Sequence, residues 1–112
     1  MHILLIKPGE YPEEKNIDGS LKSMQALVGG LIQAIYPFDD AVALVCNEEG
    51  KLEGLPLNRA LTDPENGQVY DIVCGTFFIC GLDEESFASL SPSLMEKYWA
   101  RFYYPELFFR GQ

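Results

Sequence analysis

The side chains best able to do chemistry in this chain are carboxylates, which occur in adjacent groups. The groups are Glu13-Glu14, Asp39-Asp40, Glu48-Glu49 and Asp83-Glu84-Glu85. Two carboxyl groups about 5 to 10 Å apart suffice for chemistry at a glycosidic bond, and paired carboxylates can hold a divalent metal ion. All four groups fall at expected turns or helix starts, where acidic side chains are well solvated. We therefore interpret them as solvated surface and assign no catalytic residue.

Nucleophilic catalysis and metal binding usually require histidine or closely spaced cysteines. His2 is the sole histidine, so a single chain cannot assemble a His-dependent triad or a multi-histidine metal site. Cys46, Cys74 and Cys80 are scattered through apolar runs and lack the CxxC spacing. We expect buried, reduced thiols, and we expect neither a metal ion nor another cofactor.

Asn58 and Arg59 form a separate polar pair within the stretch "GLPLNRAL". An arginine fork beside an asparagine can bind a phosphate or a carboxylate, and Pro56 stands where a helix could begin and direct its N-terminus at the anion. Alternatively, Arg59 pairs with one of the many acidic residues while Asn58 caps a turn. The sequence leaves both open, and we expect the pair at the surface.

Composition excludes several classes of function. The chain of 112 residues carries 17 acidic and 8 basic side chains, a formal net charge of -9, which repels nucleic acids and anionic membranes. The opening "MHILLIK" is too short for a signal peptide, and no apolar run approaches the roughly 18 residues of a membrane span. We expect one cytoplasmic domain over residues 1–112, with neither a nucleic acid nor a membrane as a direct partner.

Hydrophobic patterning predicts the fold class. Strands are expected to begin at His2, at Leu31, at Ala41 and at Val69 or Ile72, and the polar "YPEEKNID" is expected as an exposed edge strand or loop. Helices are expected to begin near Ser20 and Ser91, both good N-caps. The sequence thus predicts an α+β domain, a small mainly antiparallel sheet with two or three helices packed on it.

The C-terminal part of the chain is unusually aromatic. Its aromatic residues are Tyr98, Trp99, Phe102, Tyr103, Tyr104, Phe108 and Phe109. One face of a helix cannot bury so many rings, so some are expected to lie at the surface. A homodimer through this aromatic C-terminal segment is one way to cover them.

Three stretches of the chain resemble a known family. They are "VGGLIQAIYPFDDAVALVCNEEGKLEGLPLNRAL", "YDIVCGTFFICGL" and "YYPELF", in that order. Together they resemble the domain-of-unknown-function family 3846, uncharacterised short proteins of phages and mobile elements in Gram-positive gut bacteria. The resemblance implies a neighbourhood of accessory genes in which small acidic proteins often inhibit host defence, as anti-CRISPR and antirestriction proteins do. It implies no enzymatic activity.

The charge and the resemblance together favour a non-enzymatic acidic protein that binds a protein partner. We expect it to occupy a basic nucleic-acid-binding surface, such as that of a host defence nuclease. The candidate partner-binding residues, which match the family pattern and are expected at the surface, are Asp39, Asp40, Asn47, Glu48, Glu49, Asn58 and Arg59. The alternatives are a small metal-dependent carboxylate enzyme and a dimeric structural or regulatory accessory protein.

Overall fold

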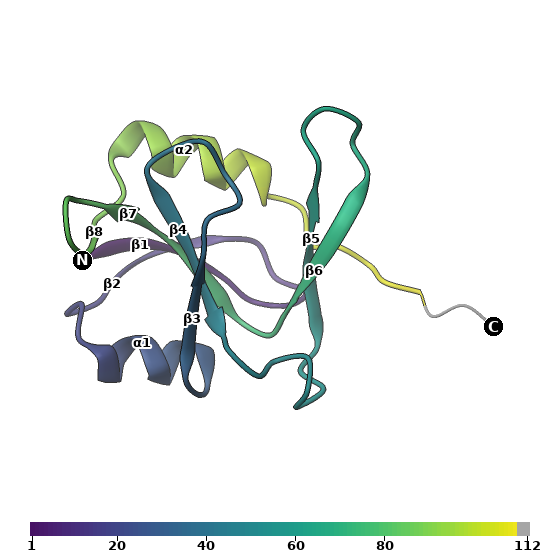
Figure 1. The fold of residues 1–112 in the computed structure, drawn as a ribbon, viewed down its shortest axis with the longest axis horizontal. Coiled ribbons are helices and arrows are strands. Elements are labelled where there is room, and N and C mark those ends of the chain that lie inside the picture. The colour runs from purple at the N-terminus through teal and green to yellow at the C-terminus, as the bar shows by residue number, and fades with distance from the viewer. Residues whose placement is uncertain (110–112) are drawn as a thin grey trace.

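The computed structural model describes residues 1–109, which form eight strands and two helices (Figure 1). The strands are β1 (His2–Ile6), β2 (Glu13–Asn16), β3 (Ile32–Ile35), β4 (Val42–Asn47), β5 (Leu57–Thr62), β6 (Val69–Cys74), β7 (Phe77–Leu82) and β8 (Phe87–Ala88). The helices are α1 (Leu21–Val28) and α2 (Pro92–Arg101). The fold is α+β, as the sequence predicts.

The main sheet has six strands, and all of their pairings are antiparallel. Its order is β2-β1-β7-β4-β3, with the short β8 paired to one end of β7. All six residues of β4 are buried, as are five of six in β7 and four of five in β1. These central strands are nearly continuous apolar runs because both of their faces are covered.

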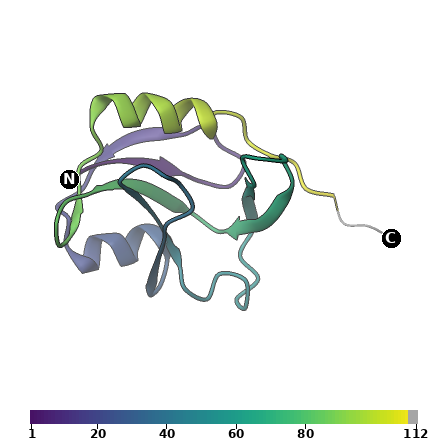
Figure 2. The ribbon, with the colours of Figure 1, turned by 45° about the horizontal axis from the view of Figure 1, so that its top comes forward.

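The two helices cover opposite faces of this sheet. Alternate strand residues point to opposite faces, and the two sets of side chains enter separate cores. In one core, Leu4, Leu44 and Ile79 pack with Met95 and Tyr98 of α2. In the other core, Leu5, Val45 and Phe78 pack with Met24 and Val28 of α1. The sheet therefore lies between two layers of helix, α2 above it and α1 below it in Figures 1 and 2.

Local signals at the helix ends act as the sequence predicts. Ser20 and Ser91 are the N-caps, and their hydroxyl oxygens accept hydrogen bonds from the backbone N–H groups of Ser23 and Leu94. Gly29 ends α1 in the left-handed conformation that glycine adopts without steric cost. Local sequence therefore sets where these helices begin, while packing on the sheet stabilises helices this short.

The expected strand at Val69 or Ile72 exists, but its assignment to the main sheet is wrong. The apolar run "VYDIVCGTFFICGL" is divided at Gly75, so that β6 pairs with β5 in a separate two-stranded sheet while β7 enters the main sheet. Gly75 has a φ of +83°, and a Cβ there would lie 2.7 Å from Leu55 Cδ1. Gly75 thus combines a positive φ with close packing against Leu55, and at this residue the chain passes from the two-stranded sheet into the main sheet.

Two further expectations have clear outcomes. No helix begins at Pro56, which the sequence offered as a possible helix start, because the residues that follow it form β5. Of the exposed edge strand or loop expected in "YPEEKNID", the structure has the strand, because Glu13–Asn16 forms β2 at one edge of the main sheet with all four residues exposed. No helix among residues 1–109 is long and apolar enough to cross a membrane.

We predict that Gly75→Ala destabilises the protein more than Gly54→Ala does. Gly54 also has a positive φ, +68°, but nothing lies within 4 Å of a Cβ placed there, so its substitution isolates the backbone cost of about 1–2 kcal/mol. Overpacking against Leu55 should remove roughly a further 1–3 kcal/mol from the free energy of unfolding of Gly75→Ala. Urea denaturation of both variants measures the difference, and equal losses would contradict the close approach.

Candidate functional site

The pairing of β4 with β7 brings two acidic turns together at one end of the main sheet. The loop between β3 and β4 carries Asp39 and Asp40, and the turn between β7 and β8 carries Asp83, Glu84 and Glu85. The two segments are joined where the backbone N–H of Leu82 donates to the carbonyl of Ala41 at 3.1 Å. We call these five acidic residues the acidic end of the molecule.

A hollow lies beside the acidic end, with a volume of about 540 Å³. It is lined by Tyr36, by the four residues of the turn from Asp83 to Ser86, and by Leu82 and Phe87. Tyr36 is 62% exposed, so its ring is available to a ligand. All of the charged side chains that line this hollow are carboxylates.

The carboxylates of the acidic end differ in how they are held. Asp83 accepts hydrogen bonds from the backbone N–H groups of Glu85 and Ser86 and from the Ser86 hydroxyl, and these bonds lower the pKa of its carboxyl. Asp83 is itself exposed, as are Asp39, Glu84 and Glu85. The turn is thus fixed by Asp83, while its neighbours present their charge to solvent.

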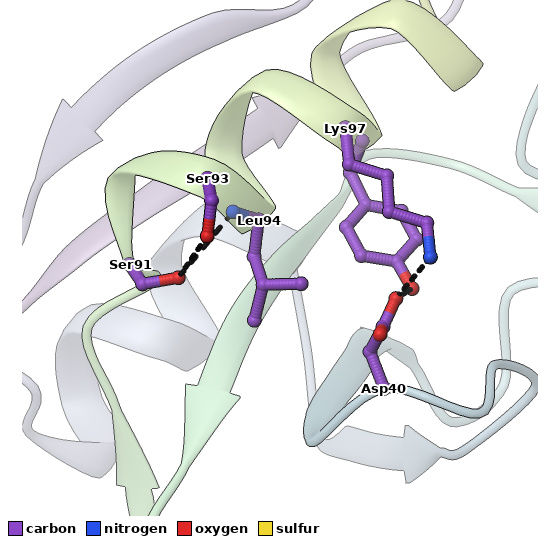
Figure 3. A network of polar contacts seen from close by, with 6 residues as sticks. Asp40, Ser91, Ser93, Leu94 and Lys97 are labelled. Atoms are coloured by element: carbon purple, nitrogen blue, oxygen red, sulfur yellow. Dashed lines mark hydrogen bonds and ion pairs between the residues drawn. The ribbon is translucent and has the colours of Figure 1, made fainter.

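Asp40 has a structural role that the sequence did not reveal. Its Oδ2 accepts hydrogen bonds from Lys97 Nζ and from the Tyr98 hydroxyl, each at 2.6 Å (Figure 3). The bonds from Lys97 and Tyr98 lower the pKa of Asp40, and burial together with Asp40 raises the pKa of the Tyr98 hydroxyl. Asp40 therefore fastens the β3–β4 loop to α2 and is not a free surface charge.

Glu48 and Glu49 do not belong to the acidic end. They are exposed, but they follow the last residue of β4, whereas Asp39 and Asp40 precede the first. The six residues of β4 separate the two groups, a distance of roughly 20 Å at the rise of an extended strand. The four acidic residues proposed from the sequence therefore lie at two opposite ends of the sheet.

Asn47, Asn58 and Arg59 are buried, so their expected surface position is wrong. Asn47 is 5% exposed, and its side chain donates to the Val28 carbonyl at 3.2 Å and accepts from the Glu49 N–H at 2.8 Å. It thereby joins the end of α1 to the turn that follows β4. A buried asparagine needs such partners, since an unsatisfied amide would be costly.

Asn58 and Arg59 form the most deeply buried polar group of the described residues, each with 0% exposure. Asn58 Nδ2 donates to the carbonyls of Ile6 at 3.0 Å and Gly75 at 2.8 Å. The Arg59 guanidinium donates to the Phe102 carbonyl through Nε and Nη2, at 3.2 and 3.0 Å. It also donates to the Glu10 carbonyl at 2.7 Å and to Asn58 Oδ1 at 2.9 Å.

These contacts give Arg59 a structural role in place of the expected anion or partner site. Burial lowers the pKa of the guanidinium, and the nearby Glu106 opposes that effect. None of the ion pairs among residues 1–109 includes Arg59, so its hydrogen bonds go to neutral oxygens. Both alternatives weighed from the sequence placed it on the surface, because no local pattern shows that β5 passes beneath the end of α2.

The cysteines are free and buried, as the sequence predicts. Burial raises the pKa of the Cys46 thiol, and it raises that of Cys80 to about 12. Cys46 and Cys74 line a second hollow of about 260 Å³ between the two sheets, beside the ion pair of Lys51 and Asp71. A raised pKa keeps Cys46 as a neutral thiol, which is the unreactive form.

His2 is the first residue of β1, and its side chain contacts the edge strand β2. Its ring nitrogens lie 2.8 Å from Asn16 Oδ1 and 2.9 Å from Glu14 Oε1, and these contacts raise its pKa. The described residues hold no group of three or more histidine, cysteine, aspartate or glutamate side chains placed to bind a metal ion.

Comparison with known proteins gives the family. Residues 1–103 match the domain of unknown function DUF3846, and the chain belongs to this family. Searches of curated proteins and of solved structures found no match. The match confirms the family resemblance drawn from the sequence.

We predict that Arg59→Lys lowers the free energy of unfolding by roughly 2–4 kcal/mol. Lysine keeps the charge but cannot reproduce the planar fork that reaches Phe102, Glu10 and Asn58 together, so buried carbonyls lose their donors. Arg101→Lys is the control, because Arg101 is exposed and contacts the Phe38 ring. Chemical denaturation measures both, and a loss for Arg59→Lys no larger than that of the control would contradict the structural role.

We also predict that Asp40→Asn destabilises the protein at neutral pH, while Asp39→Asn does not. The folded-state pKa of Asp40 is below its ordinary value of 3.8. Its stabilising contribution is therefore present above that value and is lost as the pH falls through the lower folded-state pKa. Urea denaturation at a series of pH values should show the difference between wild type and Asp40→Asn shrinking below pH 3.8. A difference that stays constant with pH would contradict the role of the charge.

Proposed function

We propose that this protein acts by binding another protein, and that the acidic end is the surface that makes the contact. The observation that supports this most directly is the convergence of two acidic turns beside a hollow that contains an exposed tyrosine. The turns are distant in sequence and meet because β4 pairs with β7. The partner is expected to present a basic surface.

The charge distribution supports a basic partner. The chain has a formal net charge of -9, which attracts positive surfaces over a long range and raises the rate of association. At the acidic end, Lys97 pairs with Asp40, whereas Asp39, Glu84 and Glu85 are exposed. Their attraction is screened beyond about 8 Å at physiological ionic strength, so the partner's cations must come close to these turns.

Arginine side chains fit the chemistry of the hollow better than lysine side chains do. A guanidinium can stack on an exposed aromatic ring and donate in parallel to a carboxylate. Tyr36 supplies such a ring, and Glu84 and Glu85 supply carboxylates along the same hollow. Arginine-rich surfaces are typical of proteins that bind nucleic-acid phosphates.

The finer proposal is that the partner is a nuclease of a defence system and that this protein blocks its nucleic-acid site. Such a role would make it an anti-CRISPR or antirestriction protein of a phage or mobile element. The negative charge and the resemblance described above support this proposal. The acidic end would then take the place of the phosphate backbone.

The decisive comparison uses two double variants with the same change in charge. Glu84→Lys with Glu85→Lys alters the acidic end, and Glu48→Lys with Glu49→Lys alters the opposite end of β4. With an oligo-arginine peptide as the probe, we predict at least about tenfold weaker binding for the first variant. The second should bind nearly as wild type does. Isothermal titration over a series of salt concentrations measures both, and NMR amide shifts locate the contact.

Wild type and the two double variants can also serve as baits in a pull-down from a lysate of the cell in which the protein is naturally made. A partner that fits the proposal is retained by wild type and by the Glu48/Glu49 variant, is lost with the Glu84/Glu85 variant, and no longer binds nucleic acid in the complex. Equal losses for both variants would mean that net charge alone matters. Either that result or peptide contacts far from Tyr36 would overturn the acidic end as the binding surface.

A further inference from the structure

The two edges of the main sheet differ sharply in how they are protected. β2 forms one edge, and its sequence, Glu-Glu-Lys-Asn, is polar and exposed at every position. β3 forms the other edge, and its sequence is Ile-Gln-Ala-Ile. Natural sheets protect exposed edges with charged residues, proline, bulges or a covering segment, because an open edge pairs with other strands. β2 is protected by charge, and β3 contains neither a charged residue nor a proline.

The uncharged character extends well beyond β3. Residues 23–38, "SMQALVGGLIQAIYPF", contain no acidic or basic side chain, although 22% of the chain is charged. Leu31 and Tyr36, which flank β3, are 59% and 62% exposed. Figure 1 shows β3 in the foreground, on the near side of β4. This edge of an otherwise strongly acidic molecule is therefore uncharged.

The hydrogen-bond pattern shows which backbone groups of β3 are left for another strand. The Leu31 carbonyl accepts from the Glu48 N–H at 2.8 Å, so the backbone polar groups of Leu31 point toward β4. The direction of the backbone N–H and C=O groups alternates along an antiparallel strand. Those of Gln33 and Ile35, which pair with Cys46 and Leu44, therefore also point toward β4. The N–H and C=O groups of Ile32 and Ala34 consequently point away from β4.

We propose that β3 is a self-association edge, at which β3 of a second copy pairs antiparallel about Ala34. This arrangement has two-fold symmetry, which is the commonest symmetry of soluble oligomers. Opposed residues on antiparallel strands share a face, so Gln33 of one copy meets Ile35 of the other, on the face of each sheet that α2 covers. The two sheets continue into one, and each helix layer continues with them.

Charge restricts a second copy to an uncharged surface such as this edge. Two copies that each carry a formal charge of -9 repel one another wherever acidic side chains would meet, so an uncharged strip is the surface through which they can approach. Antiparallel pairing also places the β3–β4 loops of the two copies at opposite ends of the joined strands. The carboxylates of the two acidic ends then stay apart.

The test is the oligomeric state of the full chain, measured by sedimentation equilibrium over a range of concentrations. We expect a monomer–dimer equilibrium for wild type. Gln33→Lys should shift it at least about tenfold toward monomer by placing a charge at the edge. Asn16→Lys, which adds the same charge at the β2 edge, should not. Ala34→Pro removes a donor that points outward, so it should dissociate the dimer while the far-UV circular dichroism stays unchanged.

Hydrogen exchange supplies a second readout that does not depend on a variant. The amides of Ile32 and Ala34 should become protected as the protein concentration rises, while exchange in β2 stays constant. A monomer at every concentration would overturn the proposal. So would a dimer that persists in Gln33→Lys and Ala34→Pro, which would point to the aromatic C-terminal segment. Protection of these amides only in the presence of another protein's extended segment would overturn a second copy as the occupant.

Discussion

The fold depends on a buried arginine whose partners are backbone oxygens from distant parts of the chain. Arg59 on β5 holds the loop after β1 through Glu10 and the end of α2 through Phe102. Asn58 holds the end of β1 and the break at Gly75. A two-stranded sheet alone is only marginally stable. These hydrogen bonds fasten β5 and β6 to the main sheet, where Leu61 and Val73 also enter the core.

Desolvation of a buried charge is costly, so the charge of Arg59 needs well-placed hydrogen-bond acceptors around it. The planar guanidinium meets that cost by donating to several oxygens at once, and every buried side-chain nitrogen and oxygen among residues 1–109 has a hydrogen-bond partner. The acid excess of the chain offers many carboxylates to an arginine, yet Arg59 uses carbonyls. Neutral acceptors leave the carboxylates at the surface, where they shape the electrostatic field of the molecule.

The main sheet determines which acidic turns lie side by side. Because β4 and β7 are neighbours, the turns at their shared end carry acidic residues side by side, while Glu48 and Glu49 lie at the far end of β4. Asp40 is used to attach the loop to α2, and Asp83 is used to form its own turn. Four of the five acidic residues at the acidic end, Asp39, Asp83, Glu84 and Glu85, are exposed, next to an exposed tyrosine.

The sequence by itself determined the features that arise from neighbouring residues. The caps at Ser20 and Ser91, the polar edge strand and the antiparallel pairing of β3 with β4 follow from local propensity and pattern, as does the α+β class. Tertiary structure alone decided that Gly75 separates two sheets and that Asn58 and Arg59 lie inside. It also decided which acidic turns meet. The reason is physical: burial and strand neighbours depend on contacts between residues far apart in the chain, and no local pattern of residue types records those contacts.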